Sequence, residues 1–253
     1  MNMKSIIILT LAGLIAASIT ATLAAKPPKM KMTTDIPASI TAPDTVPTSI
    51  GTLDFFDGVP TDKTVETVYE YLDRSRAVNV FINSIPMMSM YTLREGQASV
   101  GADASHKICI WDNLMDSTTL LLTGNTSTMY AVGFLDLLKD GPTVIDLPPG
   151  MLGILDDMAF RYMTDLGVAG PDKGKGGKYL VLPPGYDGEV PDGYFVVKSP
   201  TYANFSFIRA NASVVGTGDK ALEFYRKNAR VYPLKDGPSA PRVRNVTCLL
   251  YTS

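Results

Sequence analysis

The spacing of apolar and polar residues predicts helical structure in the first part of the chain. Residues 61–91 carry apolar side chains at three- and four-residue intervals, which is typical of an amphipathic helix. Thr61 or Asp62 can cap its first turn. Pro86 is expected to break or kink this helix, leaving a second short helix over 87–94.

From residue 107 onward the pattern changes to short β-compatible runs separated by Gly, Pro, Asn or Asp. Such runs without helical crossovers predict a mainly β chain with attached helices, α+β in class, built as an antiparallel β-sandwich of jelly-roll type. Helical spacing returns over 219–230. The predicted strands are 107–111, 118–123, 128–138, 142–147, 153–164, 178–182, 194–198 and 202–209.

The stretch 165–198 combines two strand-like runs, 179–182 and 194–197, with dense Gly, Pro and Lys. The runs look like two strands joined by a loop of about ten residues. The preceding Gly- and Lys-rich loop is either a solvated turn or an anion or substrate contact, because its amides and ammonium groups can approach an anion. It lacks the phosphate-loop pattern. The candidate ligand contacts of this region are Lys173, Lys175, Lys178 and, further on, Tyr186.

Composition narrows the class of protein. With 253 residues, 45% of them hydrophobic and 19% charged, the chain can bury a core and suits one large or two small domains. A net charge of -2 and a pI near 5.4 argue against a nucleic-acid-binding protein, which needs a clustered basic surface.

The N-terminus reads as a signal peptide over residues 1–24. Lys4 precedes an uncharged apolar run at 6–17, and small residues precede a cleavage point after Ala24. The mature protein is therefore expected to be exported, periplasmic or secreted, with no membrane span. A Pro- and Thr-rich linker is expected over 25–51, and the folded region from 52 to 234.

The two cysteines, Cys109 and Cys248, do not predict a disulfide. Cys109 lies in an apolar run, where a cysteine usually serves as a small buried apolar residue. The ending 248–253 resembles adapter-derived residues, so we expect the native chain to continue beyond about Val246 and the tail 235–253 to be truncated.

The scarcity of His and Cys excludes several chemistries. His106 is the only histidine and no Gly-x-Ser-x-Gly motif occurs, which argues against a Ser-His-Asp hydrolase. Tetrahedral zinc draws on several His and Cys ligands, so no metal and no cofactor is expected.

Carboxylates remain candidates for chemistry. Asp156, Asp157, Asp165 and Asp172 are close in sequence, and two of them could form an acid/base pair or an oxygen-ligand calcium site. Neighbouring residues of a strand point to opposite faces, so Asp156 and Asp157 cannot both line one pocket. Turn and capping roles explain the same residues without chemistry. Asp165 and Asp172 are the candidate catalytic residues.

A polar segment from Asn125 to Thr128 interrupts apolar runs. Asx and Ser/Thr turns explain it, and hydrogen bonding to a ligand by Asn125 and Thr128 is the alternative.

Several segments together resemble the family known as domain of unknown function 1254. They are LDFFDGVPTD at 53–62, LTGNTSTMY at 122–130, LDLLKDGP at 135–142, DLGVAGPDKGKGGKY at 165–179, LPPGY at 182–186 and VPDGY at 190–194. The resemblance implies a jelly-roll-like β domain with helices, followed in full-length members by a second β-rich domain, domain of unknown function 1214. It implies no established activity. At 125–128 this chain has Asn-Thr-Ser-Thr where the family would have Asn-Thr-Asp-Thr, so an acid is missing.

Two functions follow as hypotheses. The first is a non-catalytic exported β-sandwich that binds a glycan, an envelope component or a partner protein. The second is a hydrolase-type enzyme that applies carboxylate acid/base chemistry to an extracellular substrate.

Overall fold

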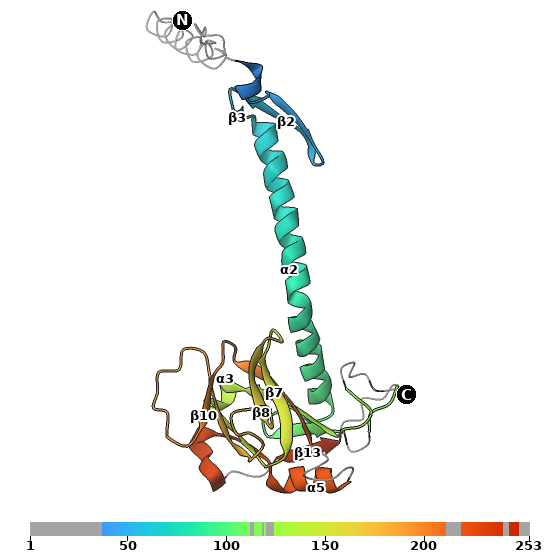
Figure 1. Ribbon diagram of the computed structural model, residues 1–253, viewed down its shortest axis with the longest axis vertical. Coiled ribbons are helices and arrows are strands. Elements are labelled where there is room, and N and C mark those ends of the chain that lie inside the picture. The colour runs from blue at the N-terminus through green and yellow to red at the C-terminus, as the bar shows by residue number, and fades with distance from the viewer. Residues whose placement is uncertain are drawn as a thin grey trace, which may run out of the picture. The chain divides into compact units, whose positions relative to one another are not determined.

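The computed structural model describes residues 37–111, 114–117, 119, 124–210, 219–239 and 243–247. The predicted signal peptide, Cys248 and most of the predicted strand 118–123 lie outside the described residues. Strands form three sheets and helices are few, which confirms the α+β class (Figure 1). The chain divides into two compact units, residues 1–72 and 73–253, which we describe separately.

The first unit holds a small antiparallel sheet that is tied to the start of a helix. Both the amide and the carbonyl of Asp54 bind the Thr64 hydroxyl, at 2.7 and 2.9 Å, and the Thr61 hydroxyl caps the helix by accepting from the Thr64 amide. Strand pairing begins within the stretch expected to be a linker. After a 3-10 turn, η1 (Ala38–Ile40), the strands are β1 (Thr45–Thr48), β2 (Gly51–Phe56) and β3 (Val59–Pro60).

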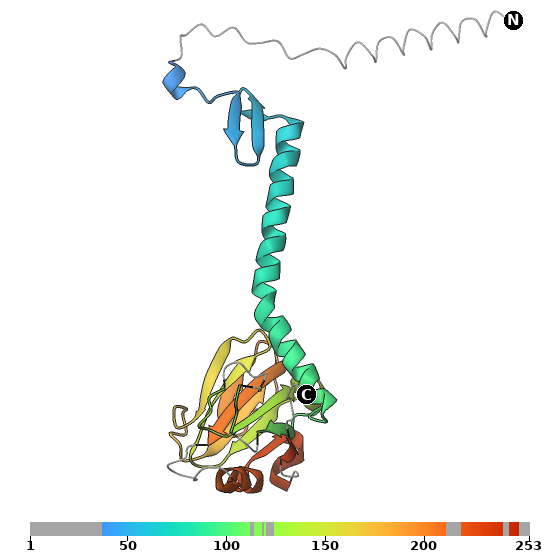
Figure 2. The same ribbon diagram turned by 90° about the vertical axis from the view of Figure 1, so that its right-hand side faces the viewer.

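A single helix, α2 (Asp62–Ser99), continues through Pro86, so the predicted break at this residue is wrong. Proline removes one amide donor and crowds the preceding turn. Side chains on both sides of it supply hydrogen bonds to backbone carbonyls one turn back, from Ser84 to Val80 at 2.7 Å and from Ser89 to Ile85 at 3.0 Å. The C-terminal part of α2 lies beside the strands of the second unit (Figure 2).

The larger sheet of the second unit has six strands, and its centre is built from segments far apart in the sequence. β11 lies between β5 and β7 and pairs antiparallel with both. At one edge β13 pairs parallel with β4. In spatial order the strands are β13 (Arg244–Thr247), β4 (Lys107–Ile110), β5 (Tyr130–Asp136), β11 (Ala203–Ala210), β7 (Met151–Asp157) and β8 (Tyr162–Gly167).

The second sheet has four strands and includes the two runs of the Gly-, Pro- and Lys-rich stretch. These runs pair parallel to each other, whereas the sequence predicted an antiparallel sandwich throughout. A parallel pair requires the connecting segment to run back along the sheet, and the loop between the two runs does so. The strands in order are β10 (Phe195–Lys198), β9 (Gly177–Leu182), β6 (Thr143–Leu147) and β12 (Arg230–Pro233).

One core cluster joins the two sheets, because it contains Ile108, Leu135 and Ile208 of the larger sheet together with Ile145 and Val181 of the smaller one. Side chains alternate along a strand, so the intervening residues of β4, β5 and β11 belong to a second cluster and those of β6, β9 and β12 to a third, on the outer faces. Both sheets are therefore apolar on both faces. The jelly-roll order stays a prediction.

Three other boundaries differ from the predictions. The predicted strand 153–164 is two strands, β7 and β8, because the chain turns at Phe160, which has a positive φ of 59°. The predicted strand 128–138 ends at Asp136, whose side chain caps the short helix α3 (Leu137–Asp140). Helix α5 (Asp219–Asn228) ends before β12, and the 3-10 segment η2 (Leu234–Ser239) follows.

Gly167 is expected to be indispensable for the β7–β8 pair. A Cβ there would lie 2.0 Å from the Met151 carbonyl oxygen, and its φ of 76° already disfavours a side chain. Gly167→Ala should lower the free energy of unfolding by more than about 3 kcal/mol, since overpacking against backbone adds to the cost of the positive φ. Urea denaturation measures the change.

Gly185→Ala is the matched control, because Gly185 has a similar φ of 70° and nothing within 4 Å of its Cβ position. It should cost only about 1 kcal/mol. Equal losses in the two variants would show that the close approach to Met151 is not what limits position 167.

Candidate functional site

The outer face of the six-stranded sheet carries polar side chains in two adjacent rows. Tyr130 of β5 and Leu152 of β7 both pair with Arg209 of β11, so the three side chains share a face. In the next row Ile154 pairs with both Phe207 and Asp165. These rows and Asn125 line a cavity of about 290 Å³, which is near the lower end of small-molecule sites.

Tyr130 forms the floor at one side of this outer-face cavity. Its ring packs on Phe207 with 4.8 Å between centroids, and its hydroxyl accepts a hydrogen bond of 3.0 Å from the Asn125 amide. The Asn125 side-chain oxygen accepts from the Ser127 amide at 3.0 Å and from the Thr128 hydroxyl. The predicted Asx turn is therefore present, and it places Asn125, but not Thr128, in the lining.

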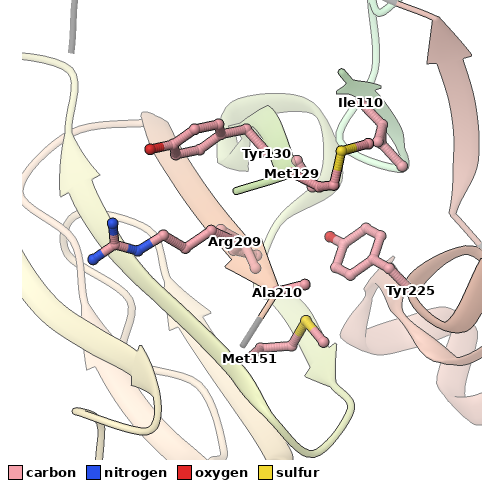
Figure 3. A pocket seen from close by; sticks show the side chains of 9 residues that line it. Ile110, Met129, Tyr130, Met151, Arg209, Ala210 and Tyr225 are labelled. Carbon is pink, nitrogen blue, oxygen red and sulfur yellow. The ribbon is translucent and has the colours of Figure 1, made fainter. Parts of the chain in front are cut away.

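A smaller cavity of about 20 Å³ lies at the other side of Tyr130 and Arg209 (Figure 3). Apolar side chains surround it, including Met129, Met151 and Tyr225. The Tyr130 hydroxyl and the Arg209 guanidinium point away from Tyr225 in this view. Burial raises the pKa of Tyr225, which keeps its hydroxyl neutral. A space of this size holds at most about one water molecule, so we assign no ligand to it.

Asp165 brings a carboxylate to the outer-face cavity from the edge strand β8. It accepts a 2.9 Å hydrogen bond from the Tyr162 hydroxyl, and this bond raises the pKa of Tyr162. Arg209 and Asp165 give the lining one positive and one negative charge. The lining can thus offer donors, acceptors and aromatic surface together.

Asp156 lies one row further along the same outer face, since it pairs with Phe205 and Tyr162. It is 3% exposed, and its Oδ1 has no hydrogen-bond partner within the described part of the chain. Burial, and next the negative charges of Asp157 and Asp165, raise the pKa of Asp156 to about 6.

Asp157 is also buried but is fully bonded. Its Oδ2 forms an ion pair of 2.6 Å with Arg161, and its Oδ1 accepts from the amides of Ala159 and Arg161. It therefore holds the β7–β8 turn closed.

The other candidate catalytic residue, Asp172, is placed apart from Asp165. It is buried in the loop before β9, where it accepts from the Tyr179 hydroxyl at 2.5 Å and from the Gly176 amide at 3.0 Å. The Tyr179 ring belongs to the core between the sheets, whereas Asp165 faces the outer side. Burial and the bond to Asp172 raise the pKa of Tyr179. These contacts give Asp172 a structural role in fixing the loop.

The remaining candidate ligand residues are not gathered into one site. Lys173 and Lys175 are exposed in the turn, and Lys173 has a positive φ of 52°. Lys178 lies in β9 opposite Asp146. Tyr186 packs on the outer face of the four-stranded sheet and donates to the Glu189 carbonyl at 3.1 Å. Their binding role stays a prediction.

A family model described as "Protein of unknown function (DUF1254)" matches residues 106–233. The chain belongs to this family. The match covers both sheets of the second unit except β13, together with the cavity lining, so the candidate site lies within the DUF1254 domain.

A solved structure is similar to part of the chain. The crystal structure of the VPA0106 protein from Vibrio parahaemolyticus, a target of the Northeast Structural Genomics Consortium, has 19% sequence identity and a TM-score of 0.47. The similarity covers 64% of this chain, and the chain spans 39% of that protein. No curated protein matches the chain.

No group of His, Cys, Asp or Glu side chains that could hold a metal ion occurs among the residues that the structure describes. Cys109 is buried in the outer cluster of the six-stranded sheet, and His106 is half-buried between α2 and β4. Within the same residues, no helix has the length and apolar character needed to cross a membrane.

Arg209 was missed because nothing around it in the sequence resembles a motif. The only signal in the sequence was its position in the two-residue alternation of the predicted strand. It lies two residues from Phe207 and four from Phe205 in a predicted strand, so it shares their face and puts a charge on an aromatic surface.

The pKa of Asp156 predicts a pH-dependent loss of stability. Below about pH 4 the carboxyl is protonated in both the folded and the unfolded chain. As the pH rises from about 4 to 6, only the unfolded chain ionises freely, so folding is disfavoured by on the order of 2–3 kcal/mol above pH 6. Asp156→Asn should therefore be more stable than the wild type at pH 7.5 and no more stable at pH 3.5, as measured by denaturant unfolding.

Asp157→Asn is the control. It breaks the ion pair with Arg161 and should destabilise the protein at pH 7.5. If Asp156→Asn also loses stability at pH 7.5, the Asp156 carboxylate has a favourable partner and the assigned cause is wrong.

Proposed function

We propose that this DUF1254 protein is an exported binding module that takes one unit of a neutral polar ligand, such as a sugar residue of an envelope glycan, in its outer-face cavity. The observation that carries the proposal is the convergence of Arg209, Asp165 and Asn125 beside the Tyr130 and Phe207 rings. Rings provide an apolar platform for the carbon skeleton of a sugar, and the polar groups can bond its hydroxyls.

The charge of the lining supports a neutral ligand. One guanidinium and one carboxylate balance each other, so a polyanion would meet Asp165 as well as Arg209. The volume of about 290 Å³ suits a single sugar unit better than a long chain segment. Export rests on the predicted signal peptide over residues 1–24, and it would place the module where envelope glycans occur.

Arg209→Ala is expected to weaken glycan binding about 10- to 100-fold, because a hydrogen bond to a charged group contributes roughly 1.5–3 kcal/mol. A glycan array identifies a ligand for the wild-type protein, and isothermal titration calorimetry measures the variant.

The double variant Lys173→Ala, Lys175→Ala is the control, because it removes two exposed cations from the Gly- and Lys-rich loop and leaves the cavity intact. Its affinity should equal that of the wild type. If this double variant loses binding while Arg209→Ala retains it, the binding site lies in the loop and not in the cavity. If the wild-type protein binds no glycan on the array, glycan binding is contradicted.

The second candidate function is carboxylate acid/base catalysis. Asp156 favours it, because a buried carboxyl with a pKa of about 6 lies in the row next to Asp165 at the cavity. Pairs of carboxyls in unequal environments serve as acid and base in glycoside hydrolysis. In this assignment Asp156 replaces Asp172 as the partner of Asp165.

A hydrolase of this kind should lose turnover as the pH rises through about 6, since Asp156 must be protonated to act as an acid. Asp156→Asn and Asp165→Asn should each lower kcat at least about 100-fold, whereas Asp172→Asn should affect stability more than kcat. Turnover of a panel of glycosides decides the question. Activity that survives both of the first two substitutions would exclude the acid/base assignment.

A further inference from the structure

The part of α2 that belongs to the second unit carries an apolar stripe of exposed side chains. Val78, Phe81, Ile85, Met88 and Thr92 follow alternating three- and four-residue steps, the heptad spacing of a coiled-coil seam. All five side chains are exposed. Met90 and Gln97, which lie on a different side of the helix, are the residues that α2 buries here. The seam is therefore unpartnered.

The stretch around the seam lacks charge. No Asp, Glu, Lys or Arg occurs from Ala77 to Leu93. Small residues beside the seam, Ser84, Ser89 and Gly96, leave a groove of about 630 Å³ along the helix. Soluble proteins rarely leave an apolar surface of this extent in water. An amphipathic helix that lies on a membrane needs Lys or Arg on its polar face, which this stretch does not have.

Heptad spacing requires another long helix as the partner. Within the described residues the other α-helices are α3, with 4 residues, and α5, with 10 residues, both shorter than the seam. A second copy of the chain supplies a helix of matching length and pattern.

The charges at the two ends of the seam determine the orientation. The next seam position before Val78 is Arg74, and the next after Thr92 is Glu95. Two parallel copies would set Arg74 against Arg74 and Glu95 against Glu95, which is unfavourable. Two antiparallel copies bring Arg74 of each close to Glu95 of the other at both ends.

We propose that the chain forms an antiparallel homodimer through the α2 seam, defined as Val78, Phe81, Ile85, Met88 and Thr92, with Arg74 and Glu95 as its charged flanks. The contact is isologous, so the same surface closes the dimer and leaves no seam free for further copies.

Light scattering after size-exclusion chromatography tests the oligomeric state of the full chain, whose mass is 27.3 kDa. The wild-type protein should have twice this mass at micromolar concentration. Phe81→Glu should convert it to a monomer, because it places a charge in the centre of the seam. Circular dichroism should show unchanged folding, since Phe81 is 71% exposed and belongs to no core cluster.

Val80→Glu is the matched control. Val80 is 66% exposed on the same helix, but it lies outside the seam, so this variant should remain a dimer. A wild-type monomer, aggregates without defined mass, or a dimer that resists Phe81→Glu would each overturn the proposal. So would loss of the dimer in both variants, because that would indicate non-specific association.

A charge exchange tests the orientation. Arg74→Glu and Glu95→Arg should each raise the dimer dissociation constant at least about tenfold, and the double variant should restore it. A double variant as weak as the single ones would exclude the antiparallel pairing. A different result would indicate a membrane contact and overturn the proposal. In that case the wild-type protein would be a monomer in solution and would sediment together with phosphatidylglycerol vesicles.

Discussion

The six-stranded sheet of the DUF1254 domain depends on having both of its faces covered. The strands β4, β5 and β11 alternate their side chains between the core shared with the four-stranded sheet and the outer cluster that includes Met90 of α2. If only one face of such a sheet were covered, the apolar side chains of the other face would remain in water. The smaller sheet and the helix are thus both required.

The outer covering is incomplete, and the candidate site lies where it ends. The cluster that contains Met90 of α2 also contains Val132 and Phe134 of β5 and Trp111, which directly follows β4. Further along, toward β7 and β8, the same face carries Arg209, Asp165 and Asp156. The cavity lies at this change from aromatic to charged side chains, so both kinds of side chain line it. The polar groups are fixed by the register of central strands and do not depend on loop conformation.

Local pattern was sufficient to predict most strands, because alternation and turn residues act over a few positions. It failed where a distant or subtle interaction decided the outcome. Pro86 lies inside α2 although its ring lacks the amide that would bond the Ile82 carbonyl one turn back. The turn at Phe160 was hidden because Met158, Ala159 and Phe160 prolong the apolar run. Parallel pairing of β9 with β10, and the placement of Arg209 and Asp165 around one cavity, depend on strand order, which no local pattern encodes. Asn125 and Asp165 were predicted from polarity alone.

The position of β11 between β5 and β7 has a consequence for how the chain folds. The strands β5 and β7 are made first but have no direct pairing with each other, so the sheet remains two separate halves until residues 203–210 are available. Contacts that span so much of the sequence close slowly. The domain therefore lacks the central strand of this sheet until residues 203–210 have been made, and the six-stranded sheet is completed only when this late segment inserts between β5 and β7.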